Sequence, residues 1–171
     1  MSEGAAPVGT GGRRRQVAVI GGGGVEEGSE AWTLAEGVGR RLAEAGVTVV
    51  CGGGGGVMEA ASRAAAEAGG DVIGIVPGDS VEDANPYCSH VVATGIGHAR
   101  NLAVVSSGEA VIAIGGAWGT LSEIGFARVI GHEVVALHSW ELDGRDQMGG
   151  APGVVPAETA EEAVAAALAA L

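Results

Sequence analysis

Three glycine-rich segments, each directly after a short apolar run, constrain the fold of this chain more than any other feature of its sequence. The segments span residues 21–24, 52–56 and 115–119, and the runs before them span residues 16–20, 48–51 and 110–114. Continuous runs of small and β-branched residues are typical of strands that are buried on both faces of a parallel sheet. Because helical spacing resumes after each glycine segment, each junction predicts a strand, a tight turn and a helix.

The rest of the chain continues this alternation of strands and helices. Further strands are predicted at residues 72–76, 90–93 and 133–137, and helices over residues 29–46, 57–68 and 159–170, with two more beginning near residues 97 and 120. The alternation predicts an α/β fold, a Rossmann-like doubly wound parallel sheet in three layers. Residues 1–14 are predicted to be a disordered arm and residues 15–171 a single domain, in which residues 143–153 form a connection.

The composition excludes several classes of function. All nine of the Lys and Arg residues are arginine, whereas a pyridoxal-phosphate enzyme and a P-loop nucleoside triphosphatase both need a lysine. The formal net charge of −12 argues against a nucleic-acid partner, because neutralising phosphates supplies most of that affinity. No apolar run reaches the roughly 18 residues of a membrane span, and no signal peptide is recognisable, so we expect a cytoplasmic protein without a membrane partner.

The arginine run and the cysteines carry weaker signals. Arg13, Arg14 and Arg15 are predicted to be a solvated arm, with a targeting role as the alternative. Cys51 and Cys88 have neither metal-ligand spacing nor a secretory context, so two free thiols and no metal site are expected. No dinucleotide cofactor is expected, because the first glycine segment is not followed by an acidic residue placed to read a ribose.

The glycine segments themselves predict a phosphate site. In a doubly wound sheet, ligands bind beyond the carboxyl ends of the strands, where glycine N–H groups and the positive ends of helices attract phosphates. An alternative is that the glycines serve only as turn residues. The candidate phosphate-binding residues are Gly21, Gly22, Gly53, Gly54, Gly55, Gly115, Gly116, Gly119 and Thr120.

Glu123 has two interpretations from its position alone. The spacing of Thr120 and Glu123 fits a capping box, in which the two side chains satisfy the free N–H groups at the start of a helix. The other interpretation is a catalytic carboxylate beside the phosphate site.

Two loops in this sequence resemble the signatures of the Lonely Guy (LOG) family and of its bacterial relatives known as putative lysine decarboxylases. Residues 52–58 resemble its Gly-Gly-Gly-x-x-Gly-x-Met loop, and residues 115–123 its Pro-Gly-Gly-x-Gly-Thr-x-x-Glu loop, with Ile114 in place of the proline. Arg100, with His98 before it, matches the arginine of the family's Met-His-Glu-Arg-Lys run. The resemblance covers almost everything after residue 15 and is nearest to a diverged bacterial branch of Rossmann-fold nucleotide-binding proteins.

The resemblance implies a phosphoribohydrolase, which cleaves the N-glycosidic bond of a nucleoside 5′-monophosphate to give free base and ribose 5-phosphate. It implies catalytic roles for Glu123 and Arg100, adds Met58 and His98 to the substrate-binding residues, and excludes a pyridoxal-phosphate lysine decarboxylase, since lysine is absent. A structural ion pair is the alternative role of Arg100. Related proteins carry the molybdenum cofactor, so a non-catalytic carrier of a phosphorylated ligand is the alternative function. A purely structural or interaction protein would leave three glycine segments unexplained.

Self-association is also expected. The resembled family is dimeric, and two predicted helices are unusually apolar, so we expect a homodimer or a higher homo-oligomer. The residues concerned are Leu102, Ala103, Val104, Val105, Leu121, Ile124, Phe126, Ala127, Val129 and Ile130.

Overall fold

A single sheet of seven parallel strands organises the computed structural model, which describes residues 12–140, 142 and 153–171. The strands are β1 (Gln16–Gly21), β2 (Thr48–Cys51), β3 (Val72–Val76), β4 (His90–Ala93), β5 (Ala110–Ile114), β6 (Glu133–Leu137) and β7 (Val154–Ala157). All six predicted strands form. The seventh, β7, was not predicted, because its four residues follow a turn-rich stretch and include Pro156, which is rare inside a sheet. In the structure Pro156 lies opposite Ala136 at the edge of the sheet.

The strand order indicates where along the sheet a ligand is expected to bind. Along the sheet the order is β4-β3-β2-β1-β5-β6-β7, so the chain builds outward from β1 in one direction and then from β5 in the other. The order therefore reverses between β1 and β5, which is where doubly wound sheets bind ligands. The predicted fold class is confirmed.

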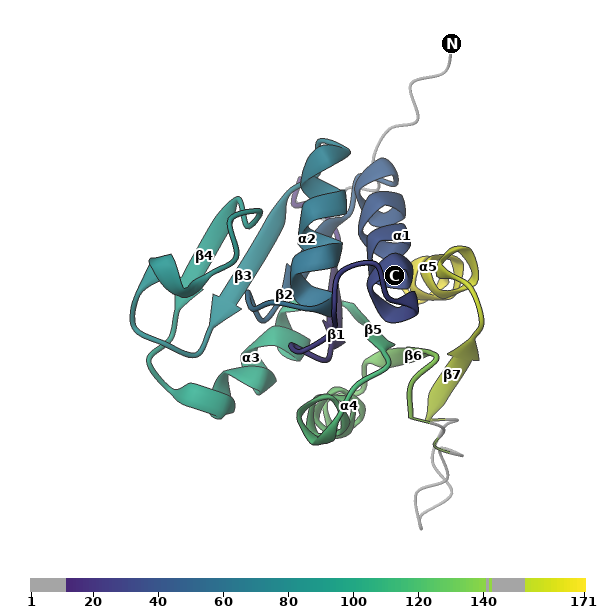
Figure 1. Cartoon of the computed structure of the whole chain (residues 1–171). Coiled ribbons are helices and arrows are strands. Elements are labelled where there is room, and N and C mark those ends of the chain that lie inside the picture. Colours follow the sequence, from purple (N-terminus) through teal and green to yellow (C-terminus); the bar gives the residue numbers. More distant parts are fainter. Residues whose placement is uncertain (1–11, 141, 143–152) are drawn as a thin grey trace.

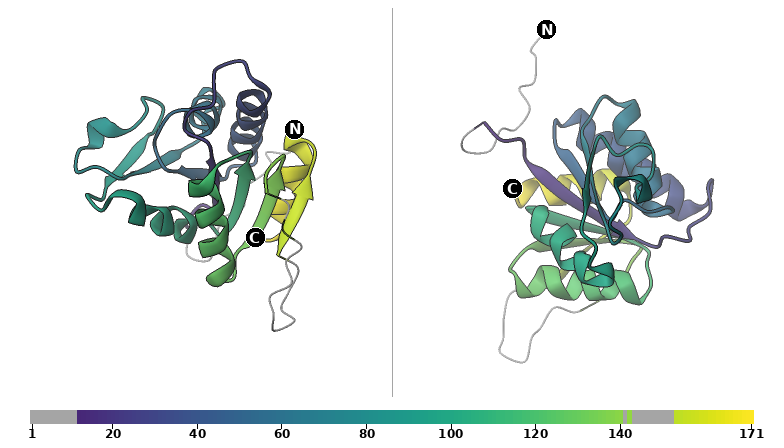
Figure 2. Two further views of the ribbon diagram at one scale, coloured as in Figure 1. Left: turned by 60° about the horizontal axis from the view of Figure 1, so that its bottom comes forward. Right: turned by 90° about the vertical axis from the view of Figure 1, so that its left-hand side faces the viewer.

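Helices cover both faces of the sheet and complete three layers (Figures 1 and 2). Helices α1 (Glu30–Glu44), α2 (Val57–Glu67) and α5 (Ala160–Ala169) pack on one face, and α3 (Arg100–Ser107) and α4 (Trp118–Val129) on the other. Short 3₁₀ turns, η1 (Val81–Asp83) and η2 (Gly97–Ala99), lie before β4 and α3. No helix in the described part of the chain is long and apolar enough to cross a membrane.

The side chains of Arg13 and Arg14 are exposed, as expected of a solvated run, but all three arginines have acidic partners. Arg15 forms an ion pair with Glu109 at 2.7 Å, and Arg14 one with Asp71 at 3.3 Å. The run thus lies against acidic residues at the amino ends of the strands instead of forming a free arm. Residues 1–11 of the predicted arm at residues 1–14, and most of the predicted connection at residues 143–153, lie outside the described residues.

Part of the expected surplus apolar surface is used inside the chain. Val104, Val105, Ile124 and Ala127 are fully buried in the core beneath α3 and α4. The exposed remainder consists of Leu102, Phe126, Val129 and Ile130. Self-association stays a prediction.

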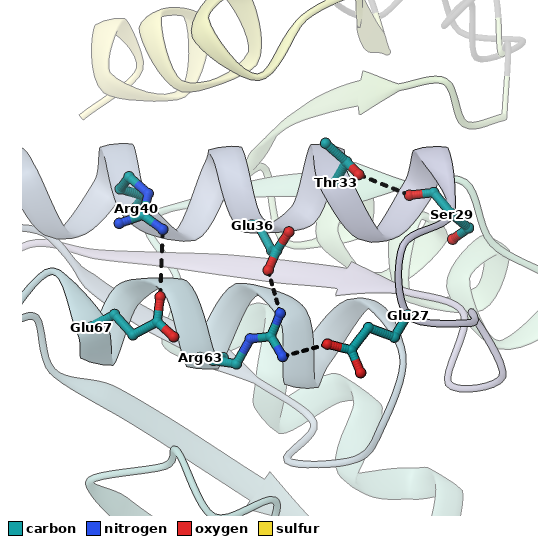
Figure 3. A network of polar contacts seen from close by, with 7 residues as sticks. All are labelled: Glu27, Ser29, Thr33, Glu36, Arg40, Arg63 and Glu67. Carbon is teal, nitrogen blue, oxygen red and sulfur yellow. Dashed lines mark hydrogen bonds and ion pairs between the residues drawn. The ribbon is translucent and has the colours of Figure 1, made fainter.

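Helices α1 and α2 are locked together by a backbone approach and by ion pairs. A Cβ built on Gly39 would lie 2.1 Å from the carbonyl oxygen of Ala61, so only glycine allows this contact. Beside it, Arg63 contacts Glu27 at 2.7 Å and Glu36 at 2.6 Å (Figure 3). Because α2 begins at the second glycine segment, this packing fixes the direction from which that segment enters the site.

Replacing Gly39 with alanine should lower the free energy of unfolding by about 1–3 kcal/mol, because the added methyl group overpacks the helix contact. The matched control is Gly125→Ala in α4, where a Cβ would meet no atom within 4 Å. That change should be neutral or stabilise by up to about 1 kcal/mol, since alanine is the better helix former. Urea denaturation of both variants measures the difference, and equal stabilities would contradict the assigned contact.

Candidate functional site

A cavity of about 250 Å³ opens at the point where the strand order reverses. Its walls come from the first two glycine segments, from α2, from the turn before α3, and from the first turns of α4. The side chains with ionisable groups in the lining are His98, Arg100 and Glu123. This composition, backbone with one cation and one carboxylate, is suited to an anionic ligand.

Glycine is required where these walls meet. A Cβ on Gly21 would lie 2.5 Å from the oxygen of Ile114, and a Cβ on Gly52 would lie 2.7 Å from the Arg100 guanidinium. Side chains at these positions would either separate the strand ends or displace Arg100. The bare backbone therefore forms the wall of the cavity, and it brings N–H groups within reach of a ligand.

Arg100 and Glu123 face each other across the cavity. The Nη1 atom of Arg100 lies 3.8 Å from Oε1 of Glu123, and the two side chains are only 13% and 9% exposed. Arg100 also donates a hydrogen bond to the side-chain oxygen of the buried Asn101. Its Nε atom is buried and has no hydrogen-bond partner among the residues that the structure describes. The pair is thus a loose contact that leaves donor capacity on the guanidinium.

Burial changes the acidity of Glu123. Removal from water raises the pKa of this carboxyl group to about 7, against the opposing effect of the Arg100 charge, and the nearby Cys51 raises it further. A carboxyl group that titrates near neutral pH in a cavity can accept or release a proton under physiological conditions.

The capping-box interpretation of Glu123 is wrong. Helix α4 begins at Trp118 with Ala117 as the N-cap, and no side chain caps it. Thr120 and Glu123 therefore lie inside the helix, and both are buried. Side-chain caps do form at Ser29 of α1 and at Thr159 of α5.

The uncapped helices face the site. Helix α2, like α4, has no side-chain cap, and its N-cap is Gly56 with φ of 61°. The first N–H groups of an α-helix have no partner within the helix, so these two helix starts retain donors for an anion.

The cavity includes many of the predicted residues and leaves out others. Gly53, Gly54 and Gly55 do not line it, and neither do Gly115 and Gly116, although Gly115 lines a smaller neighbouring hollow. Among the predicted residues, those in the lining are Gly21, Gly22, Met58, His98, Arg100, Gly119, Thr120 and Glu123.

Five of the lining residues were missed by sequence reasoning, and one of them, Ile20 in β1, was predicted only as a strand residue. Gly23 and Gly52 lie in glycine segments that were recognised, but other glycines of these segments were selected as ligand-binding residues. Asn101 holds Arg100 by a hydrogen bond, and only its place next to that arginine could have suggested this. Ala117 lines the cavity as the N-cap of α4, and an alanine side chain does not indicate a binding role in a sequence.

A larger hollow of about 460 Å³ is lined by residues of β6 and β7, at one edge of the sheet, and by residues that follow these strands. Trp140, Val154 and Pro156 form much of its wall. His138 and Glu158 in its lining contact each other, with Nε2 of His138 3.3 Å from Oε2 of Glu158. The smaller cavity is the better candidate site because its cation has unused hydrogen-bonding capacity.

Comparison with known proteins gives a consistent result. The family model described as the SLOG cluster4 family matches residues 14–166. An uncharacterized protein of Archaeoglobus fulgidus is 41% identical over 122 residues, which cover 71% of this chain and 79% of that protein.

Two solved structures share the fold over nearly their whole length. The molybdenum cofactor binding protein of Rippkaea orientalis has a TM-score of 0.78 and 28% identity, covering 92% of this chain and 97% of that one. The molybdenum cofactor carrier protein of Chlamydomonas reinhardtii has a TM-score of 0.79 and 29% identity, covering 93% and 98%.

The pKa of Glu123 predicts how stability depends on pH. The folded protein holds this proton up to about pH 7, whereas an unfolded chain releases it near 4.5. The contribution of Glu123 to stability is therefore present below about pH 4.5 and is lost as the pH rises through 7. Glu123→Gln has no proton to lose, so its unfolding free energy relative to the parent should rise by about 2–3 kcal/mol between about pH 5 and pH 8.

Chemical denaturation at several pH values measures this difference. The control is Glu161→Gln on the exposed side of α5, which removes a carboxylate from the surface and should give a difference that stays flat with pH. A flat difference for Glu123→Gln as well would contradict a raised pKa.

Proposed function

The chain belongs to the SLOG cluster4 family, and from this membership and the geometry of the cavity we propose that it binds a small phosphorylated ligand of the nucleotide or pterin class. The phosphate lies against the glycine backbone of the first two segments and the start of α4. Arg100 supplies the positive charge that a lysine supplies in other phosphate sites.

The observation that carries this proposal is the Arg100 guanidinium in the cavity lining, which reaches Glu123 only at 3.8 Å. A guanidinium that is mostly buried and only loosely paired is suited to a charge-assisted hydrogen bond with a second anion. In this cavity a phosphate oxygen would accept a hydrogen bond from the guanidinium and would neutralise its charge, which Glu123, at 3.8 Å, contacts only loosely.

The solved structures described above support a carrier role. The relatives from Rippkaea orientalis and Chlamydomonas reinhardtii are described as binding or carrying the molybdenum cofactor. That cofactor contains a pterin with a phosphate, and here it would be cargo. At Gly21 and Gly52 the cavity wall is bare backbone, so no side chain of theirs stands between the wall and such a phosphate.

Arg100→Ala should weaken binding of AMP, or of molybdenum cofactor transferred from a donor enzyme, by about 10–100-fold. This is the loss expected when a charge-assisted hydrogen bond is removed. Isothermal titration or cofactor retention on a desalting column measures the change.

The matched control is Arg40→Ala, which removes an equal charge from the outer surface of α1, where Arg40 pairs with Glu67 at 3.5 Å. Its affinity should change by less than about twofold, because exposed ion pairs contribute little. Parental affinity in Arg100→Ala would refute the assigned phosphate contact.

Hydrolysis of a nucleoside 5′-monophosphate is the second candidate function. It is favoured by Glu123, a buried carboxyl group in the cavity lining with its pKa raised to about 7. Cleavage of an N-glycosidic bond builds positive charge on the ribose, and a carboxylate can stabilise that charge and orient the attacking water. Arg100 would hold the phosphate end of the same substrate.

This candidate predicts turnover that rises with pH. With a pKa of about 7, the ionised fraction of Glu123 increases about tenfold between pH 6 and pH 8, and release of adenine and ribose 5-phosphate from AMP should increase in the same proportion. Glu123→Gln should abolish release while AMP still binds. A parent protein that binds AMP without releasing adenine at any pH is a carrier.

A further inference from the structure

Beneath the second glycine segment lies a buried polar cluster that the proposed function does not use. It consists of Cys51 at the end of β2, Ser62 in α2, and Asn85 and Cys88 in the loop before β4. The Sγ of Cys51 lies 3.5 Å from Oγ of Ser62, and the Cys88 thiol lies 3.6 Å from the side-chain oxygen of Asn85. Cys51 is fully buried and Cys88 is partly exposed.

Gly74 is the reason that the two cysteines meet. It is the register partner of Cys51 on the neighbouring strand β3, and parallel strands lie about 4.8 Å apart with paired side chains on the same face. A Cβ on Gly74 would lie only 2.6 Å from the Sγ of Cys88. The Cys88 sulfur therefore occupies the space beside Cys51 that a side chain at residue 74 would fill, and both thiols pack in the same core cluster.

The same cluster holds the glycine segment in place. The N–H of Gly53 donates to the Cys51 sulfur at 3.4 Å. The backbone N–H of Asn85 donates to the Gly53 oxygen at 2.7 Å, and its side chain donates to the Gly54 oxygen at 3.0 Å. Gly52, which follows Cys51 directly, is in contact with the Arg100 guanidinium. A change at either sulfur is thus transmitted to the wall of the cavity.

We propose that Cys51 and Cys88 form a reversible disulfide that reshapes the second glycine segment. A peroxide is the oxidant. The thiolate of the pair attacks its O–O bond, which gives a sulfenic acid and a hydroxide that is protonated to water. The second thiol attacks the sulfenic sulfur, the S–O bond breaks, and the S–S bond forms with release of a second water. A dithiol returns the disulfide to two thiols.

The electrostatics of the pair favour its first ionisation. Hydrogen bonding from Cys88 lowers the pKa of Cys51 to about 7, with smaller lowering effects from Ser62, Gly53 and Arg100, although burial alone would raise it. The same hydrogen bond, together with burial, raises the pKa of Cys88. One proton is therefore released near neutral pH and one is retained, which is the state from which a thiolate reacts.

The consequence for the ligand rests on the proposed function. Forming the S–S bond takes the Cys51 sulfur away as the acceptor for Gly53 and removes a negative charge near both Arg100 and Glu123. We expect the affinity for AMP to differ by at least about tenfold, in either direction, between the oxidised and the reduced protein.

Intact mass after peroxide treatment of the folded full chain tests the disulfide directly. The parent should lose about 2 Da and, when labelled after unfolding, both maleimide-reactive thiols, and dithiothreitol should restore them. Cys51→Ser and Cys88→Ser should each fail to lose this mass. Gly74→Ala keeps both cysteines but places a methyl group against Cys88, so it should also lose the disulfide. Two thiols that remain reactive in the oxidised parent, or oxygen addition without the loss of about 2 Da, would overturn the proposal.

Amide NMR spectra test the effect on the loop without any ligand. Oxidation should shift the resonances of Gly53, Gly54 and Asn85 and leave those of α5 unchanged. A disulfide that forms without these shifts would overturn the proposed coupling. If the reduced protein fails to bind AMP, the proposed function fails for that ligand, whereas the mass and the amide shifts still decide on the disulfide.

Discussion

Close contact between backbones at the carboxyl ends of the strands is the constraint on which the site depends. A Cβ on Gly56 would lie 2.2 Å from the Gly22 oxygen, so the first and second glycine segments touch without any side chain between them. Gly21 makes an equally close approach to the end of β5. These contacts leave a small cavity, and Arg100 and Glu123 enter it from the two helices on one face of the sheet. The glycine backbone thus forms part of the cavity wall, and Arg100 and Glu123 supply the charged groups of its lining.

The sequence was informative wherever a feature depends on local spacing. The five strands β1, β2, β3, β5 and β6 were predicted because burial on both faces leaves a direct signature, and the short edge strand β4 was predicted as well. The approach of Arg100 to Glu123 followed from the positions of both residues just past strand ends. The strand β7 was missed because the turn-rich stretch before it and its own proline carry a signal closer to that of a loop.

Other features depend on contacts between distant segments, which a linear pattern does not record. The start of α4 lies at Trp118 because the turn at Gly115 and Gly116 has positive φ angles, and this moves Thr120 and Glu123 from the cap into the helix. The meeting of Cys51 and Cys88 depends on the register between β2 and β3 and on the missing side chain of Gly74. Neither arrangement is visible from the spacing of the residues concerned.

The proline in β7 has a consequence for how copies of this protein can associate. Strand β7 forms one edge of the sheet, and at Pro156 it has no N–H group to offer to a further strand. Continuation of the sheet from this edge into a second molecule is therefore disfavoured. The exposed side chains of Val129 and Ile130 lie instead at the end of α4, on a helical layer. Contact between copies through helices would leave the hydrogen bonding of the sheet, and with it the position of the cavity, unchanged.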